Sequence, residues 1–134
     1  MTIEHRQALQ SEQALIGALL RDNDAIDEIN GLKTQAFSRE DHQIIFKNII
    51  ESIESGKPVD MIILAEELDR KGELKRVGDL DYIGALVQSA CASKNVAVHA
   101  KSIDKQWKLR RLKALLDDLS NLTESRYDLD HILE

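Results

Sequence analysis

The residue types that most often carry chemistry are sparse in this chain and poorly spaced for it. The histidines show no i, i+3 or i, i+4 pair of the kind that holds a metal on a helix; they are His5, His42, His99 and His131. The single cysteine, Cys91, excludes an internal disulfide and a thiolate zinc site, and its small neighbours are typical of a buried position. The sequence therefore predicts no metal site and gives no sign of a cysteine nucleophile.

Gly56-Lys57 is the only Gly-Lys pair and thus the one candidate for a phosphate-binding loop. Such a loop has another Gly five positions earlier and a Ser or Thr after the Lys, but Glu51 and Pro58 occupy those positions. Adjacent carboxylates at 66–67 and 117–118 fall on the polar faces of expected helices, which is typical of solvated surface. We expect no catalytic residue, no cofactor and no enzymatic activity in this chain.

The charge balance and the apolar pattern exclude further classes of protein. Basic residues number 18 and acidic residues 24, so the net charge is −6. A domain whose main task is to hold phosphate backbones carries a basic face, so we expect weak or no direct binding to nucleic acid. The first residues are polar and mixed in charge, so we expect no signal peptide. No apolar run approaches the about 20 residues that span a bilayer, so we expect a cytoplasmic protein with no membrane contact.

The elements that position the side chains are expected to be helices throughout. One Pro, six Gly and 4% aromatic residues, without sustained alternation of apolar and polar residues, indicate an all-α chain. The apolar spacing predicts helices with N-caps at Ser11, Ser38 and Asp60, and a further helix that begins at Gly78-Asp79. We expect these helices to form a compact orthogonal bundle over residues 1–95.

The longest helical pattern runs from about 96 to 122 and predicts a projecting arm within residues 96–134. Its length of about 40 Å compares with a radius of gyration of about 14 Å for a compact chain of this size. Leucines recur along its outer part with the 3-4-3 spacing of a heptad seam, which favours self-association over packing on the chain's own core. These leucines are Leu109, Leu112, Leu116 and Leu119, with Leu115 and Leu122 widening the stripe.

Charge order along this arm and the end of the chain leave several alternatives open. A basic stretch at 101–113 precedes an acidic one that begins at Asp117, so the chain either turns back near Ser125 or presents plain solvated faces. A DNA-contacting role for the basic stretch is a further possibility. Asp128 is a predicted N-cap for a helix cut at Glu134, which indicates a frayed terminus or a piece of a longer chain.

A series of short motifs follows the chain in order: SEQALIGALL at 11–20, DHQIIF at 41–46, GKPVD at 56–60, LAEEL at 64–68, GEL at 72–74, VG at 77–78, YI at 82–83, NV at 95–96 and LRRL at 109–112. Together these motifs resemble the N-terminal domain of DnaB-type replicative helicases. The similarity lies in the order and spacing of the motifs rather than in any one of them. Departures from the family pattern are Gln10 for a usual Glu, Asp79 for the second Gly of a Gly pair, and Cys91 near a usual Pro.

The resemblance implies a helical body followed by a helical hairpin that pairs two protomers, with three such dimers forming a collar on a hexameric motor. The hairpin's first arm would then contain the dimer-interface residues Leu109, Leu112, Leu115, Leu116 and Leu119, and residues 128–134 would begin its second arm. The family's ATP-dependent helicase motor lies C-terminal to this domain, so this chain itself would be no enzyme.

The resemblance also implies partners: primase, and in some systems a helicase loader. The family's primase-contact positions correspond to Tyr82, Lys113 and Leu119. Tyr82 is expected either as a partly exposed interface anchor or as an aromatic packed under the loop at 71–77. The alternative function is that of a free-standing phage or plasmid protein of the same fold, which would bind or inhibit primase or helicase.

Overall fold

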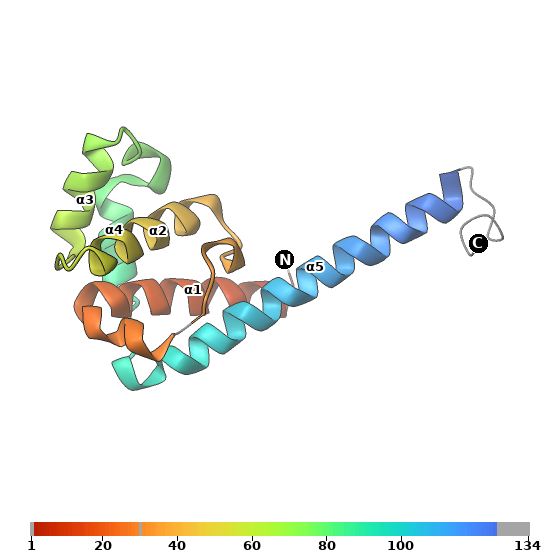
Figure 1. Ribbon diagram of the computed structural model, residues 1–134, viewed down its shortest axis with the longest axis horizontal. Helices are drawn as coiled ribbons and strands as arrows, with labels where there is room; N and C mark the ends of the chain where they lie inside the picture. The colour runs from red at the N-terminus through yellow and green to blue at the C-terminus, as the bar shows by residue number, and fades with distance from the viewer. Residues whose placement is uncertain (1, 30, 126–134) are drawn as a thin grey trace.

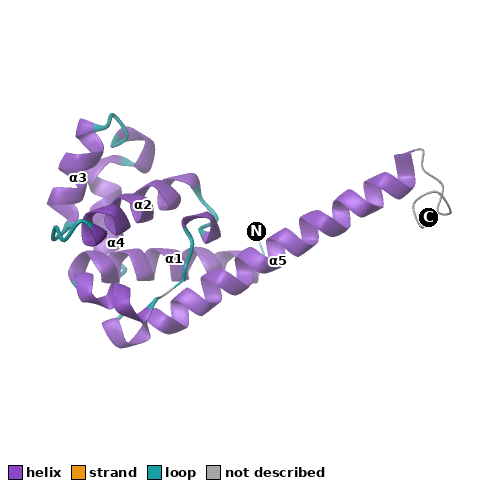
Figure 2. Cartoon of the chain, in the orientation of Figure 1, coloured by secondary structure: helices purple, strands orange, loops and turns teal. Residues whose placement is uncertain are grey.

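The computed structural model describes residues 2–29 and 31–125. Within these ranges the expected all-α class is confirmed, because helices and short 3-10 turns are joined by loops and no strand occurs (Figure 2). No helix in these ranges is both long enough and apolar enough to cross a membrane. The helices are α1 (Ile3–Arg21), α2 (Glu40–Glu54), α3 (Met61–Arg70), α4 (Asp79–Gln88) and α5 (Val96–Ser125), and the 3-10 turns are η1 (Asn23–Glu28), η2 (Thr34–Ala36), η3 (Lys75–Val77) and η4 (Ser93–Asn95).

The predicted start of the first helix at Ser11 is wrong, since α1 begins at Ile3. Thr2 is the N-cap, and its hydroxyl oxygen accepts from the backbone N–H of His5 at 3.1 Å. Ser11 is buried in the middle of α1, where its hydroxyl lies 3.0 Å from Nδ1 of His99 on α5. The first two turns of α1 bury only Ala8, so they lack the apolar periodicity by which a sequence reveals a helix.

The predicted cap at Ser38 is also wrong, whereas the cap expected at Asp60 and the helix start expected at Gly78-Asp79 are confirmed. Helix α2 begins at Glu40 with Arg39 in the cap position, because Ser38 is engaged by a carboxylate of α1. The carboxylate of Asp60 accepts from the backbone N–H of Ile63 at 2.8 Å at the start of α3. Gly78 precedes α4 with a φ of 90°, a left-handed conformation that a glycine adopts without strain.

Helix α1 is the centre of the body, as its nearly all-round apolar sequence predicts. It packs against α2, α4 and α5 (Figure 1), and Leu15, Ile16 and Leu19 are fully buried between them. Phe37 and Phe46 extend this core, with ring centroids 4.5 Å apart. Burying apolar surface on every side of α1 holds the helices that carry the candidate sites in fixed relative positions.

Helices α1 and α4 cross so closely that a side chain has no room at Gly17. A Cβ atom placed there would lie 2.0 Å from the carbonyl oxygen of Leu86 and 3.0 Å from Cα of Ala90. Both of these are backbone atoms, which can move only if the helices separate. The helix crossing therefore depends on glycine at position 17.

We expect Gly17→Ala to lower the free energy of unfolding by about 2–3 kcal/mol, as overpacked cores do. Helix propensity alone would favour Ala by about 1 kcal/mol, so steric overlap has to outweigh it. The matched control is Gly84→Ala in α4, where the nearest atom to the new Cβ is the flexible Cε of Met61 at 3.4 Å. Urea denaturation followed by circular dichroism measures both variants, and equal stability of the two would contradict the proposed close crossing.

The long helix α5 belongs partly to the body and partly to an arm that leaves it (Figure 1). Its inner turns bury Val96, Ala100 and Ile103 against the core. From 111 to 124 every residue is exposed, so the prediction that part of this helix projects is confirmed. The predicted second arm at 128–134 lies outside the described residues.

Candidate functional site

Tyr82 lies where α1, α2 and α4 meet, and its phenol oxygen is held from two sides. The oxygen lies 2.6 Å from Nε2 of His42 on α2 and accepts from the side-chain amide of Gln13 on α1 at 3.3 Å. The rings of Tyr82 and His42 stack, with centroids 5.9 Å apart and planes 10° apart. The half-buried Tyr82 ring is thus fixed at its inner end and open to solvent along part of its edge.

A buried carboxylate lies behind this contact. Nδ1 of His42 is 2.8 Å from one oxygen of Glu12, and the side chains of both residues are almost completely buried. The other oxygen of Glu12 accepts from the backbone N–H and the hydroxyl of Ser38, at 3.0 and 2.7 Å. Because a carboxylate can only accept, Nδ1 of His42 carries a proton, and a neutral ring then accepts from the Tyr82 hydroxyl through Nε2. Every buried polar atom of the set has a partner.

Arg39 covers the face of the Tyr82 ring, with its guanidinium carbon 5.6 Å from the ring centroid. It also forms a two-pronged ion pair with Asp41, at 3.1 and 2.6 Å. Partial burial acts to lower the pKa of Arg39, but the hydrogen bond and charge of Asp41 outweigh it, so the pKa lies above its ordinary value. Tyr82 and Arg39 together present an aromatic edge and a fixed cation to solvent, the residue types that dominate binding energy at protein interfaces.

This arrangement is suited to docking a protein and not to catalysis. Both nitrogens of His42 are occupied, and its ring is fully buried, so a substrate has no access to it. The thiol of Cys91 is partly buried, which raises its pKa above the ordinary value and disfavours the reactive thiolate. Among the described residues no group of three or more possible ligands could hold a metal ion.

The second candidate surface is the leucine stripe on the outer part of α5. Each predicted interface leucine is about half exposed: Leu109 47%, Leu112 53%, Leu115 62%, Leu116 57% and Leu119 54%. Isolated exposed leucines are common on soluble proteins, whereas a stripe of them along one helix is a candidate surface for contact with another molecule.

The three predicted primase-contact residues do not form one cluster in this chain. Tyr82 makes its hydrogen bonds to α1 and α2 within the body. Lys113 and Leu119 lie on the exposed outer part of α5, in the arm. One partner would therefore have to contact both the body and the arm to reach all three residues.

Reasoning from the sequence missed Glu12, Gln13, Ser38 and His42 as parts of one site. In the sequence His42 is one of four scattered histidines, because its partners lie 30 and 40 positions away in the chain. No helical spacing connects such residues. The only signal in the sequence was that Glu12-Gln13 and His42 fall within motifs of the family resemblance.

Comparison with known proteins places the chain beside one family. The family model for the "DnaB-like helicase N terminal domain" matches residues 4–105. The chain is 33% identical over 123 residues to the replicative DNA helicase DnaB of Rhodothermus marinus, covering 91% of this chain and 13% of that protein. It is 34% identical over 107 residues to the protein of the same name from Mycobacterium leprae, and this match covers 79% of this chain and 18% of that protein. The chain thus spans less than a fifth of the length of either relative.

Two solved structures share the fold. The N-terminal domain of the DnaB helicase from Mycobacterium tuberculosis superimposes with a TM-score of 0.80 and 30% identity, over 84% of this chain and 81% of that one. A DnaB-like replicative helicase, whose structure was described together with its interactions with primase, gives a TM-score of 0.71 and 20% identity. That superposition covers 87% of this chain and 28% of the helicase, and at this identity it shows the fold alone.

Proposed function

Because this chain belongs to the family of DnaB-like helicase N-terminal domains, we propose that it is the oligomerisation and protein-docking domain of a replicative DNA helicase. The observation that carries the proposal is the exposed leucine stripe on a helix that projects from a body of this fold. The domain's role in DNA replication is to make contacts with other proteins. ATP hydrolysis and movement along DNA belong to other parts of the parent protein.

Self-association takes place through the arm. Burial of the leucine side chains against a second copy would contribute about 1.5–3 kcal/mol each, before the loss of translational and rotational freedom is subtracted. The charges on α5 fit an antiparallel partner, because Lys108 and Arg111 precede the stripe's midpoint whereas Asp117 and Asp118 follow it. Three such dimers would form the collar that the family resemblance implies.

The partner class we propose for the body is the primase of the same replication system. A solved structure of this fold is described with its interactions with primase. Tyr82 and Arg39 supply an aromatic edge and a cation in the body, while Lys113 and Leu119 lie on the arm. A helicase loader is a second partner class that the resemblance implies. The net charge of −6 favours protein contacts over tight binding to DNA.

Tyr82→Ala tests this docking role. We expect it to weaken binding of the C-terminal domain of the cognate primase about 30-fold, which corresponds to about 2 kcal/mol and is typical of an interface hot spot. Tyr82→Phe keeps the ring and removes only the hydroxyl, so affinity should stay within about threefold while unfolding free energy falls by about 1 kcal/mol. Isothermal titration and thermal melting measure the two effects separately.

The matched control is Asp81→Ala, an exposed position next to Tyr82 on α4, which should change neither quantity appreciably. Unchanged primase affinity in a folded Tyr82→Ala variant would remove this residue from the site. If the unaltered chain does not bind the primase domain at all, the proposed docking function is wrong.

A further inference from the structure

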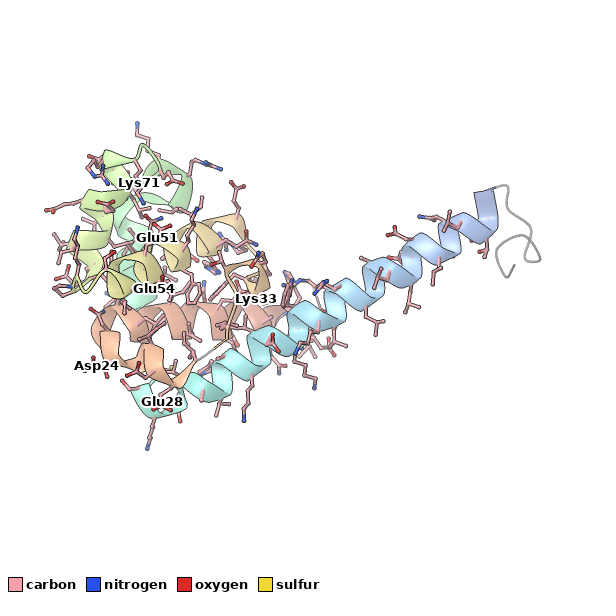
Figure 3. The ribbon with its side chains drawn as sticks, in the orientation of Figure 1. Asp24, Glu28, Lys33, Glu51, Glu54 and Lys71 are labelled. Atoms are coloured by element: carbon pink, nitrogen blue, oxygen red, sulfur yellow. The ribbon has the colours of Figure 1, made fainter. Side chains whose placement is uncertain are left out.

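A groove runs along the inner half of α5, on the side where the helix packs against residues 28–29 and 31–33. Its volume is about 450 Å³. Figure 3 shows Glu28 beside the first turns of α5 and Lys33 near the point where the helix leaves the body, so the two mark opposite ends of this surface. We call it the Trp107 groove, after the only tryptophan in the chain, which lines it.

The floor of the Trp107 groove is apolar. Ile29, Leu32 and Ala100 form it together with the half-buried indole of Trp107. Trp107 also packs against the hydrophobic core, so its ring is held in place from below. Such a floor can take up one large apolar side chain of a partner, because a rigid aromatic surface is buried at low cost in conformational entropy.

The rim of the groove is basic although the chain as a whole is acidic. The ammonium of Lys33 lies 5.9 Å from the centroid of the Trp107 ring, and the guanidinium of Arg111 lies 5.0 Å from it. Lys101 lines the same groove. None of these three cations has a carboxylate partner among the described residues, whereas the nearby Asp104 is paired with Lys108 at 2.7 Å. Three unpaired cations therefore converge around one apolar floor.

We propose that the Trp107 groove binds an acidic peptide segment of a partner protein that carries a large apolar side chain. Acidic residues of the segment would pair with Lys33, Lys101 and Arg111, and its apolar side chain would lie on the floor. From Ala97 to Arg111 the groove follows about 21 Å of helix, which accommodates about six residues of extended peptide.

The charges favour a peptide over a nucleic-acid strand. Glu28 and Asp104 lie among the cations of the lining and would repel a backbone with one negative charge per nucleotide. An acidic segment can place its few carboxylates beside the free cations and present uncharged side chains elsewhere.

The proposal does not rest on the primase-docking function, because Tyr82 and the leucine stripe do not line the groove. Its test is a fluorescence titration of the full 134-residue chain with a capped peptide of sequence Glu-Asp-Leu-Phe-Asp-Glu, at low ionic strength. The peptide has no tryptophan, and excitation at the long-wavelength edge of the tryptophan band avoids the two tyrosines of the chain, so the emission reports on Trp107. We expect a saturable change in emission, and at least fivefold weaker binding when Ser replaces Leu and Phe in the peptide.

The double variant Lys101→Glu and Arg111→Glu should weaken peptide binding at least tenfold. The matched control is Lys94→Glu with Lys105→Glu, which changes the net charge equally at cations that do not line the groove and should bind within twofold of the unaltered chain. Circular dichroism verifies that both variants are folded.

Several results would overturn the proposal. They are no saturable signal with the unaltered chain, an equal loss in both double variants, equal affinity for the Ser-containing peptide, and tighter binding of an oligothymidylate than of the acidic peptide. Sedimentation of the same variants shows whether the groove instead lies between copies of the chain. A loss of self-association in the groove variant, with peptide affinity unchanged, would also count against the proposal.

Discussion

Replacing Leu112 and Leu116 with Asp should convert the self-associating chain into a folded monomer. Both side chains are more than half exposed in the isolated chain, at 53% and 57%, so an Asp at either position is solvated in the monomer. In a dimer the two carboxylates would be buried without partners, at a cost of several kcal/mol. We therefore expect self-association to weaken by at least 100-fold. The melting temperature should hardly change, because these positions lie beyond the body.

Sedimentation velocity over a range of concentrations measures the association, and circular dichroism measures the folding. The matched control is Ala114→Asp with Asn121→Asp, which adds the same charges on the opposite side of the same helix. The control should associate like the unaltered chain. If the leucine variant unfolds, the stripe belongs to the core. If it still associates, or if the unaltered chain is monomeric at all concentrations, the proposed arm interface is wrong.

Loss of the Glu12 carboxylate should be the most destabilising single change in the body. Glu12→Ala removes the acceptor for Nδ1 of His42, which is buried, and for both donors of Ser38, which is part-buried. Leaving a buried donor without an acceptor costs about 1–3 kcal/mol for each donor, so we expect the free energy of unfolding to fall by about 3–5 kcal/mol in total. That is a large part of the about 5–15 kcal/mol by which a domain is stable, so the variant should be partly unfolded near body temperature.

Two further variants locate the origin of this effect. Glu12→Gln keeps one acceptor oxygen but turns an amide group toward a donor, so its stability should lie between those of Glu12→Ala and the unaltered chain. Glu67→Ala removes an equal charge from a surface pair with Arg70 and should have little effect, since solvent screens such pairs. Urea denaturation monitored by Trp107 fluorescence ranks the variants. Equal stability of Glu12→Ala and Glu67→Ala would contradict a structural role for the buried set.

The sequence by itself determined the features that depend on neighbours within about four residues. Apolar spacing predicted the all-α class, the central position of α1 and the long helix α5, because a helix repeats every 3.6 residues along the chain. The sequence also predicts the cap at Asp60, because the backbone N–H that its side chain accepts from belongs to Ile63, only three residues away. The projection of the arm followed from length alone.

Only the tertiary structure decided which distant residues meet. Glu12, His42 and Tyr82 come from three helices, and helix packing alone brings their polar atoms to within 2.6–2.8 Å. Ser38 likewise does not cap α2, because its backbone N–H and its hydroxyl donate to the buried carboxylate of Glu12. Lys33 reaches Trp107 only once α5 lies against the loop before α2. Buried polar groups form hydrogen bonds with whichever groups the packing of the helices brings next to them. The local periodicity of the sequence does not predict which distant residues these are.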